Sequence, residues 1–253
     1  MESAASPARS LSLGSFSARF PALPPAAHLL NGLFLAALLL AVAALPAAAQ
    51  EAGRQMAQEA AIPPMDSPVV FDVLRDGSKV GEHRLVFEPE DGDTLKVSVE
   101  TAMSVKFGFI TTFRYEHKRV ERWRGGELES LAGMTNDDGR EYEVSIVRKA
   151  GHYSRTVNGA EEELEGPVKV DSLWSRDRLT AGKLFSAATD GVYRVRSDAL
   201  GWETIEIPGG KVEAEHVKLT GEIDRDLWYG PGGELLKVRY ETQEGETFEY
   251  VRR

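Results

Sequence analysis

Short glycine-containing turn pairs recur along most of the sequence, and they constrain the fold more than any other feature. Asx-Gly and Gly-Gly pairs supply the positive φ angles that tight hairpin turns require. They separate runs rich in β-branched and aromatic residues, which favour strands. We therefore predict an antiparallel meander. The pairs are Asp76-Gly77, Asp91-Gly92, Gly125-Gly126, Asp138-Gly139, Asn158-Gly159, Asp190-Gly191, Gly209-Gly210, Gly232-Gly233 and Glu244-Gly245.

Between the turns, apolar and polar residues alternate with a period of two. In the run 94–107 the odd-numbered positions are apolar or Thr, and most even-numbered positions are polar. Near the C-terminus, the same alternation places Leu236 and Val238 on one face of a strand and Leu235 on the other. Such a pattern predicts strands with one face on a core and the other in solvent.

Several predicted strands are long, notably 94–107, 109–123 and 211–223. Strands of this length suit a strongly curved sheet or a barrel wall better than a compact sandwich. The predicted fold class is therefore mainly β, with one long antiparallel meander curved into a half-barrel.

One segment, at about 171–188, lacks the alternation and contains helix-forming residues. Asp171 or Ser172 is a suitable N-cap for a first helical turn. We predict one or two short helices here, inserted into the sheet and lying across its open side. Their apolar stripe would consist of Leu173, Trp174, Leu184 and Phe185.

Residues 1–49 have the parts of a secretory signal peptide: a basic start, the apolar run Leu29–Leu45 and small residues at Ala47 and Ala49. We expect cleavage between Ala49 and Gln50. The alternative is an uncleaved anchor, although the run is short for a hydrocarbon core about 30 Å thick. The absence of a twin-arginine pair favours the general secretory route, so we expect a soluble periplasmic protein without a transmembrane anchor after processing.

The mature chain is expected to start with a flexible leader. Residues 50–68 are rich in Ala, Gln and Glu and end in closely spaced prolines, which block regular strand pairing. A single β domain is predicted for 69–253.

Composition excludes several classes of function. The chain of 253 residues has no Cys, which rules out disulfides, a thiolate nucleophile and cysteine-ligated zinc. Its formal net charge is −10, with no compensating basic run, so nucleic-acid binding is not expected. A hydrophobic share of 42% is sufficient for a folded core.

The sequence carries no recognisable catalytic or metal-binding motif, and we expect no catalytic residue, metal or cofactor. It has no His-Glu-x-x-His, nucleophile elbow, phosphate loop or dinucleotide fingerprint. One row on a single strand face is distinctive, and it predicts a polar patch on a concave wall. A solvated or edge position would explain its histidine equally well. The row consists of Tyr115, His117, Arg119, Glu121 and Trp123.

Large aromatic side chains are numerous for a sheet with one insert. Most must belong to the core, but a half-barrel covered by an insert also tends to leave a concave apolar cavity. Whether the rings fill the core or line a pocket stays open at this point. The expected ligand-lining residues are Phe113, Tyr115, Trp123, Trp174 and Phe185.

From about Val69 onwards the chain resembles an exported bacterial family catalogued as a domain of unknown function. The meander is also similar in architecture to the LolA/LolB-like envelope proteins, and this resemblance implies a half-barrel that holds lipid acyl chains. The motifs that carry the resemblance are Phe71-x-Val73, Val80-Gly81-x-His83, Tyr115-x-His117-x-x-x-Glu121-x-Trp123, Leu173-Trp174, Asp226-Leu227-Trp228-Tyr229 and Gly233-x-Leu235-x-Lys237.

Three functional hypotheses follow. The leading one is a non-enzymatic periplasmic protein that binds a lipid or other hydrophobic small molecule on the concave face. The second is a structural or adaptor protein with a filled core, whose exposed edge strand recruits an envelope protein partner. The third is an enzyme with a dispersed site around His117 and Glu121.

Overall fold

The computed structural model describes residues 68–107, 110–179 and 182–253. The predicted signal peptide, the cleavage position between Ala49 and Gln50, and all but the last residue of the predicted leader lie outside the described residues. No helix in the described part of the chain has the length and apolar character needed to cross a membrane.

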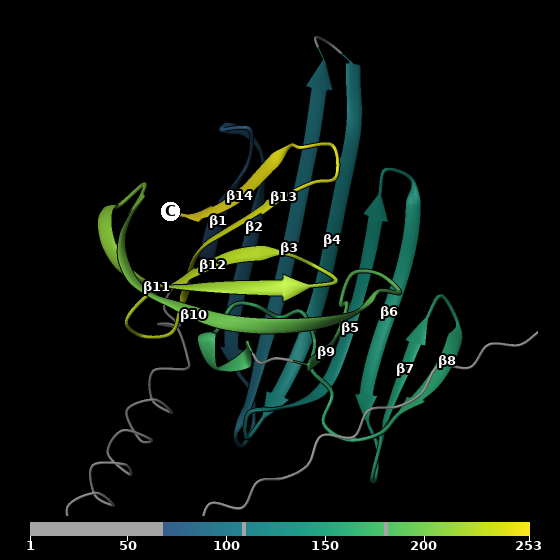
Figure 1. The fold of residues 1–253 in the computed structure, drawn as a ribbon. Helices are drawn as coiled ribbons and strands as arrows, with labels where there is room; N and C mark the ends of the chain where they lie inside the picture. Colours follow the sequence, from purple (N-terminus) through teal and green to yellow (C-terminus); the bar gives the residue numbers. More distant parts are fainter. Residues whose placement is uncertain (1–67, 108–109, 180–181) are drawn as a thin grey trace, which may run out of the picture. The chain divides into compact units, whose positions relative to one another are not determined.

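Fourteen antiparallel strands form one sheet, in the order β8-β7-β6-β5-β4-β3-β2-β1-β14-β13-β12-β11-β10-β9 (Figure 1). Two meanders, β1 to β8 and β9 to β14, are joined by the pairing of the first strand with the last. The predicted fold class is confirmed. The strands are β1 (Val69–Arg75), β2 (Ser78–Pro89), β3 (Thr94–Phe107), β4 (Ile110–Arg124), β5 (Glu127–Asp137), β6 (Arg140–Arg148), β7 (Tyr153–Val157), β8 (Ala160–Leu164), β9 (Gly182–Phe185), β10 (Val192–Ile207), β11 (Gly210–Gly221), β12 (Arg225–Tyr229), β13 (Leu235–Glu241) and β14 (Thr247–Arg252).

The tight hairpins use the turn pairs that the sequence indicated. Asp76 and Gly77 join β1 to β2 with φ angles of 48° and 77°, and Asn158 and Gly159 join β7 to β8 with 49° and 84°. Positive φ at both central residues is the requirement of a type I′ turn, whose twist matches that of the flanking strands. These short connections keep successive strands adjacent and produce the meander.

The sheet is strongly curved. Fourteen flat strands spaced about 4.8 Å apart would place the two edge strands roughly 60 Å from each other. Nevertheless Leu164 of β8 and Leu184 of β9, from opposite edges, belong to one buried core cluster that also contains Val97, Leu131 and Leu219. Figure 1 shows β10 to β12 running across the direction of β3 to β6. The concave face of the sheet therefore encloses the core.

The loop after β9 returns to the opposite end of the sheet. Arg155 of β7 donates a hydrogen bond to the Thr189 carbonyl oxygen at 3.3 Å. At Gly133 of β5, an added Cβ would lie 3.0 Å from the Ala187 carbonyl oxygen and 3.1 Å from the Cβ of Arg119. Only glycine allows this close approach without displacing a neighbour.

The predicted alternation fails at one point in β13. Trp228 pairs with Lys237 and Tyr229 pairs with Leu235, so Leu236 is an extra residue in a β-bulge. The bulge reverses the phase of the strand. Leu235 therefore joins Val238 in the main core, and Leu236 packs in a separate cluster with Trp228.

The helical prediction for 171–188 is largely wrong. The described residues of the segment, 171–179 and 182–188, contain one 3₁₀ turn, Arg176–Arg178, and Gly182–Phe185 form strand β9. The physical reason is that its hydrogen-bond partners lie in the sheet: Val170 bridges Phe185, and Ser175 bridges Glu234. We call residues 168–179, which cross the concave face through a bend, a turn and the 3₁₀ turn, the crossing segment.

On one side, the crossing segment is attached to β11, β12 and β13. The Tyr229 hydroxyl donates to the Leu173 carbonyl oxygen at 3.0 Å, and the Leu235 amide donates to the Trp174 carbonyl oxygen at 3.3 Å. Arg176 forms an ion pair with Glu215 at 2.7 Å.

On the other side, the crossing segment is attached to Glu121 of β4. This carboxylate has no exposed surface and accepts hydrogen bonds from Ser172 Oγ at 2.5 Å and Trp174 Nε1 at 3.2 Å. From its own strand it accepts Arg119 Nε at 2.6 Å and Trp123 Nε1 at 2.8 Å. Burial alone would raise the pKa of Glu121, but the Arg119 guanidinium and the donated hydrogen bonds outweigh burial and hold the pKa below its usual range.

The two indoles bound to Glu121 also hold a cation between their faces. The Arg178 guanidinium lies 3.9 Å from the Trp123 ring centroid and 4.5 Å from that of Trp174. Burial lowers the pKa of Arg178 to about 10, so the group remains charged at neutral pH. Cation–π contacts of this kind are stabilising when desolvated. Glu121 therefore orients both indole rings by accepting their Nε1 hydrogen bonds, and its negative charge favours the charged form of Arg178.

His117 extends this polar network along β4. Its side chain is 2% exposed, its Nδ1 lies 2.8 Å from Thr135 Oγ1, and Arg119 Nη1 lies 3.1 Å from its Nε2. Because the guanidinium can only donate, Nε2 accepts, and Nδ1 donates to the Thr135 hydroxyl. Burial, and then the Arg119 charge, lower the pKa of His117 to about 3, so the imidazole is neutral.

Replacement of Glu121 tests the importance of the buried carboxylate for stability. Glu121→Gln removes the negative charge that compensates Arg119. It also places an amide NH₂ group, which can only donate, next to side chains that themselves donate. We therefore expect the free energy of unfolding to fall by about 3–5 kcal/mol. Urea unfolding measures the change. The matched control is Glu116→Gln, in an exposed pair with Arg114 on the same strand, with an expected loss below about 0.5 kcal/mol. Equal losses would contradict the argument.

His117 predicts a pH dependence of stability. Its folded pKa of about 3 lies below the ordinary value near 6.5, so its contribution is complete above pH 6.5 and is lost as the pH falls toward 3. Between pH 7 and 5 this amounts to about 2 kcal/mol. His117→Asn should therefore show a correspondingly smaller loss of unfolding free energy over that range. The control His152→Asn, in the loop between β6 and β7, should keep the wild-type slope.

Candidate functional site

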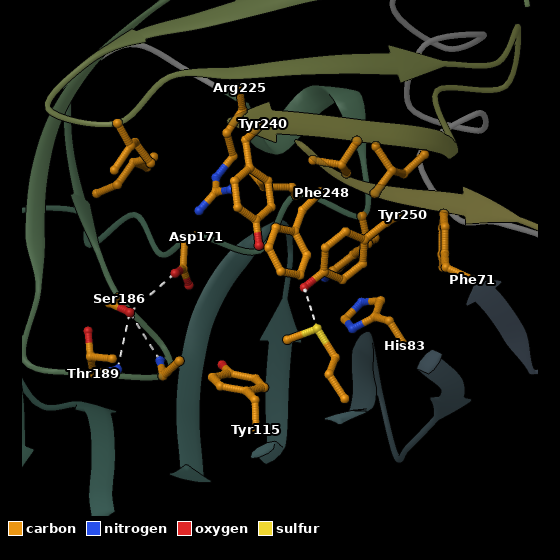
Figure 2. A pocket seen from close by; sticks show the side chains of 18 of the residues that line it. Phe71, His83, Tyr115, Asp171, Ser186, Thr189, Arg225, Tyr240, Phe248 and Tyr250 are labelled. Carbon is orange, nitrogen blue, oxygen red and sulfur yellow. Dashed lines mark hydrogen bonds between the residues drawn. The ribbon is translucent and has the colours of Figure 1, made fainter. Parts of the chain in front are cut away.

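A cavity of about 410 Å³ lies on the concave face, between the sheet and the crossing segment (Figure 2). Its walls come from β1 to β4, from β9, β10 and β12 to β14, from the crossing segment and from the loops after β9 and before β12. Figure 2 shows Phe71 and His83 at one end, and Asp171, Ser186 and Arg225 at the other. The cavity therefore has an apolar end and a polar end.

The apolar end is built from inward positions of the central strands. These positions alternate with outward ones, so each strand contributes every second residue. Tyr240 and Phe248 stack with their ring centroids 5.5 Å apart and an interplanar angle of 8°. The apolar residues that line the cavity as a whole are Phe71, Leu85, Met103, Phe113, Leu173, Trp174, Leu184, Ala188, Ile223, Leu235, Val238 and Phe248.

Polar side chains within the apolar end are uncharged. His83 lies 5.8 Å from the Phe71 ring and 5.5 Å from the Tyr250 ring, and its Nδ1 lies 2.7 Å from Thr101 Oγ1. Burial lowers the pKa of His83 to about 3, and burial raises the pKa values of Tyr115 and Tyr250. At neutral pH, these groups present rings and neutral polar atoms to the cavity.

At the polar end, Asp171 and the loop after β9 hold each other in place. Ser186 Oγ donates to Asp171 Oδ2 at 3.3 Å and accepts the Thr189 amide at 3.2 Å, and the Ala187 amide donates to Asp171 Oδ1 at 2.9 Å. Both Asp171 oxygens are therefore bonded within the protein.

Two arginines also line the cavity. The Arg225 guanidinium lies 4.3 Å from the Tyr240 ring centroid. Arg119 connects the cavity to the buried network, because it bonds to Glu121 and His117 and also lines the cavity. Burial alone would lower the pKa of Arg119, but the carboxylates of Glu121 and Asp171 outweigh it and hold the pKa above its usual range.

Three of the five aromatic residues predicted to line a ligand site do line this cavity: Phe113, Tyr115 and Trp174. Trp123 lines a different cavity, of about 800 Å³, on the other side of the Trp123–Trp174 contact. Phe185 is not among the residues of the first cavity. Its ring is buried, and Lys183 Nζ lies 4.6 Å from its centroid. Because β9 is a strand, its inward residue is Leu184.

The predicted polar patch is a buried network. Arg119 lines the cavity, but His117 and Glu121 do not, since their exposed fractions are 2% and 0% and their polar atoms bond within the protein. The alternative of a solvated His117 is also wrong. Burial of this row is caused by the crossing segment, which covers it with Ser172 and Trp174.

Sequence reasoning missed the lining residues of the first and last strands. Phe71, His83, Phe248 and Tyr250 meet in the cavity because β1 pairs with β14, with Phe71 opposite Arg252 and Val73 opposite Tyr250. Local periodicity predicts which face each side chain occupies but not which distant strand lies beside it. Across the described ranges, no cluster of three or more His, Asp or Glu side chains is arranged to hold a metal ion.

Comparison with solved structures shows the same fold elsewhere. The chain is similar to the crystal structure of a beta-barrel-like protein of the domain of unknown function DUF1849 from Brucella abortus, with a TM-score of 0.53 and 7% identity. The match covers 74% of this chain and 97% of that chain. At this identity the similarity concerns the fold alone.

Sequence comparisons give no indication of an enzymatic activity. No curated protein matches the chain. The model of a family described as a domain of unknown function, DUF6134, matches residues 71–253, in agreement with the resemblance noted from the motifs. The chain belongs to the DUF6134 family.

Proposed function

We propose that the protein is exported to the periplasm and there binds a lipid or other hydrophobic small molecule in the concave cavity, without catalysing a reaction. The observation that carries the proposal is the cavity of about 410 Å³ lined by aromatic and aliphatic side chains. Small-molecule sites are typically apolar clefts of about 300–1,000 Å³ with a few placed polar groups.

Burial of an acyl chain would supply sufficient free energy. Each buried methylene contributes about 0.8 kcal/mol, so ten methylenes contribute about 8 kcal/mol. Loss of translational freedom and ordering of the chain oppose this by several kcal/mol. The balance corresponds to useful binding without any specific polar contact, which suits a lining whose charged groups lie at one end.

The geometry gives no support to an enzyme with a site around His117 and Glu121. Both groups are buried outside the cavity, and Glu121 accepts four hydrogen bonds within the protein. His83, the histidine that lines the cavity, bonds to a buried threonine and to no carboxylate among the described residues. A base oriented by an acid and facing a substrate is therefore not formed by these groups.

Export is supported by the sequence of residues 1–49 alone. We expect the protein isolated from its native host to begin at Gln50, because Ala47 and Ala49 provide the small side chains that precede cleavage. Intact-mass measurement of the protein from the periplasmic fraction tests this directly. A full-length chain retained in the membrane fraction would favour the uncleaved anchor instead.

A second candidate function is recruitment of an envelope protein. β9 pairs only with residues 192–195 of β10, so residues 196–207 have a strand partner on one edge only within the described part of the chain. Leu200 and Trp202 on this stretch are 59% and 57% exposed. Unpaired strand edges bind extended segments of other chains. A Trp202→Lys variant should then lose a partner protein in pull-down from the native host while it keeps ligand binding.

Binding of a neutral environment-sensitive dye tests the leading proposal. We expect N-phenyl-1-naphthylamine to bind the native protein saturably with one site. Ala188 lines the cavity, so Ala188→Trp should fill it and weaken dye binding at least tenfold. The matched control Ala199→Trp, at an exposed position of β10, should bind like the wild type. Circular dichroism and thermal unfolding verify that both variants fold.

Absence of saturable dye binding by the native protein would refute the proposed function. Equal binding by the two tryptophan variants would place the dye outside this cavity. As an independent measure, native extraction followed by mass spectrometry should find a lipid or other amphiphile that copurifies with the wild type and is depleted in Ala188→Trp.

A further inference from the structure

We propose that the ligand is an amphiphile with an anionic head group, and that Arg225 binds this head while the apolar tail occupies the aromatic end of the cavity. The inference rests on the proposed function and adds the chemical class of the ligand. The two ends of the cavity correspond to the two parts of such a molecule: Phe71 and His83 lie at one end, and Arg225 and Asp171 at the other (Figure 2).

Arg225 is a positive charge without a carboxylate partner. Among the residues that the structure describes, no Asp or Glu oxygen lies within 4.0 Å of its guanidinium. The side chain is half-buried and rests on the Tyr240 ring at 4.3 Å, which orients it toward the cavity. A guanidinium presents its donors in a planar fork that matches a carboxylate or phosphate.

Arg119 adds a second donor to the same cavity. Its side chain is 10% exposed, with Nε bonded to Glu121 and Nη1 bonded to His117. Its Nη2 has no hydrogen-bond partner among the described residues. Since Arg119 lines the cavity, this remaining donor is available to a ligand oxygen.

Asp171, the only carboxylate among the described residues that line the cavity, is already bonded to the loop after β9. Its two oxygens accept from Ser186 Oγ and from the Ala187 amide. The unmet hydrogen-bonding capacity at the polar end therefore consists mainly of donors. A cationic head group would be repelled by the Arg225 guanidinium. An apolar group would remove water from the arginine N–H donors without offering them an acceptor.

The other titratable groups do not change this charge balance at neutral pH. Burial lowers the pKa values of His83 and His117 to about 3, so neither adds a positive charge. Burial raises the pKa values of Tyr115, Tyr240 and Tyr250, so none adds a negative charge. Among the described lining residues, Arg225 and Arg119 are the positive groups and Asp171 is the negative one. The charge of Arg119 is compensated by Glu121 at 2.6 Å. Arg225 is then the charged lining group that has no carboxylate partner in the described part of the chain, whereas both Asp171 oxygens already accept hydrogen bonds.

The test compares ligands with the same twelve-carbon tail and different heads. Laurate, dodecyl phosphate, dodecanol and dodecyltrimethylammonium are titrated, below their critical micelle concentrations, into the full mature protein loaded with N-phenyl-1-naphthylamine. We expect at least one of the two anions to displace the dye about tenfold more tightly than dodecanol, because a charge-assisted hydrogen bond adds to the same tail burial. The ammonium should bind more weakly than dodecanol.

Variants assign the head group to its residue. Arg225→Met keeps an unbranched side chain on Tyr240 and removes the charge, so the preference for the anion should disappear while dodecanol binds as before. Arg225→Gln provides the same test if the Met variant does not fold. The matched control is Arg196→Met, an exposed arginine of β10, which should keep the wild-type preference.

The outcomes separate the two proposals. If the dye binds and dodecanol displaces it as well as both anions do, or if the ammonium binds best, the anionic-head inference is overturned and the proposed function stands. A preference that survives in both Arg225 variants overturns the assignment to Arg225. If no ligand displaces the dye, binding in the cavity itself is refuted, and the inference fails with it. The relative affinity of laurate and dodecyl phosphate distinguishes a fatty-acid from a phospholipid-like source.

Discussion

The buried carboxylate of Glu121 is the interaction on which the arrangement of this domain depends. A charge with no exposed surface is tolerated only when it is compensated and hydrogen-bonded, and here Arg119 and three further donors provide both conditions. Two of these donors belong to the crossing segment. The carboxylate thus fixes the crossing segment to β4, while Tyr229 and Glu215 fix it to the opposite wall. Closure of the open side of the sheet follows from the same contacts.

The cavity is a consequence of this closure. The crossing segment covers the concave face without filling it, since a cavity of about 410 Å³ remains between it and the sheet. Trp174 packs against Phe87 and Trp123, and the space beyond it is bounded by the central strands. Regular helices at this position would place more side chains in the same volume. Trp174 and the other aromatic side chains at this position therefore line an open interior and do not fill it.

Local patterns in the sequence predicted the strands, the turns and the curvature, because each depends on residues close together in the chain. Asp76-Gly77 and Asn158-Gly159 are turns for reasons of backbone sterics alone. The crossing segment was interpreted as helical because it lacks period-two alternation, but its hydrogen-bond partners are distant strands. The site was predictable only in part for the same reason. Tyr115 and Trp174 could be assigned to it from their neighbours, whereas Phe248 enters it through the long-range pairing of β14 with β1.

The pairing of β1 with β14 puts the beginning and the end of the domain at the middle of the sheet, and its edges are formed by strands from the interior of the sequence. A chain that folds as it is synthesised from the N-terminal side receives β14 after the other strands of the sheet. Until Phe248 and Val251 emerge, β1 has no second neighbour and the two meanders remain separate sheets. Completion of the hydrophobic interior therefore waits for β14, and a partly synthesised domain exposes the unpaired edges of β1 and β13 to chaperones and proteases.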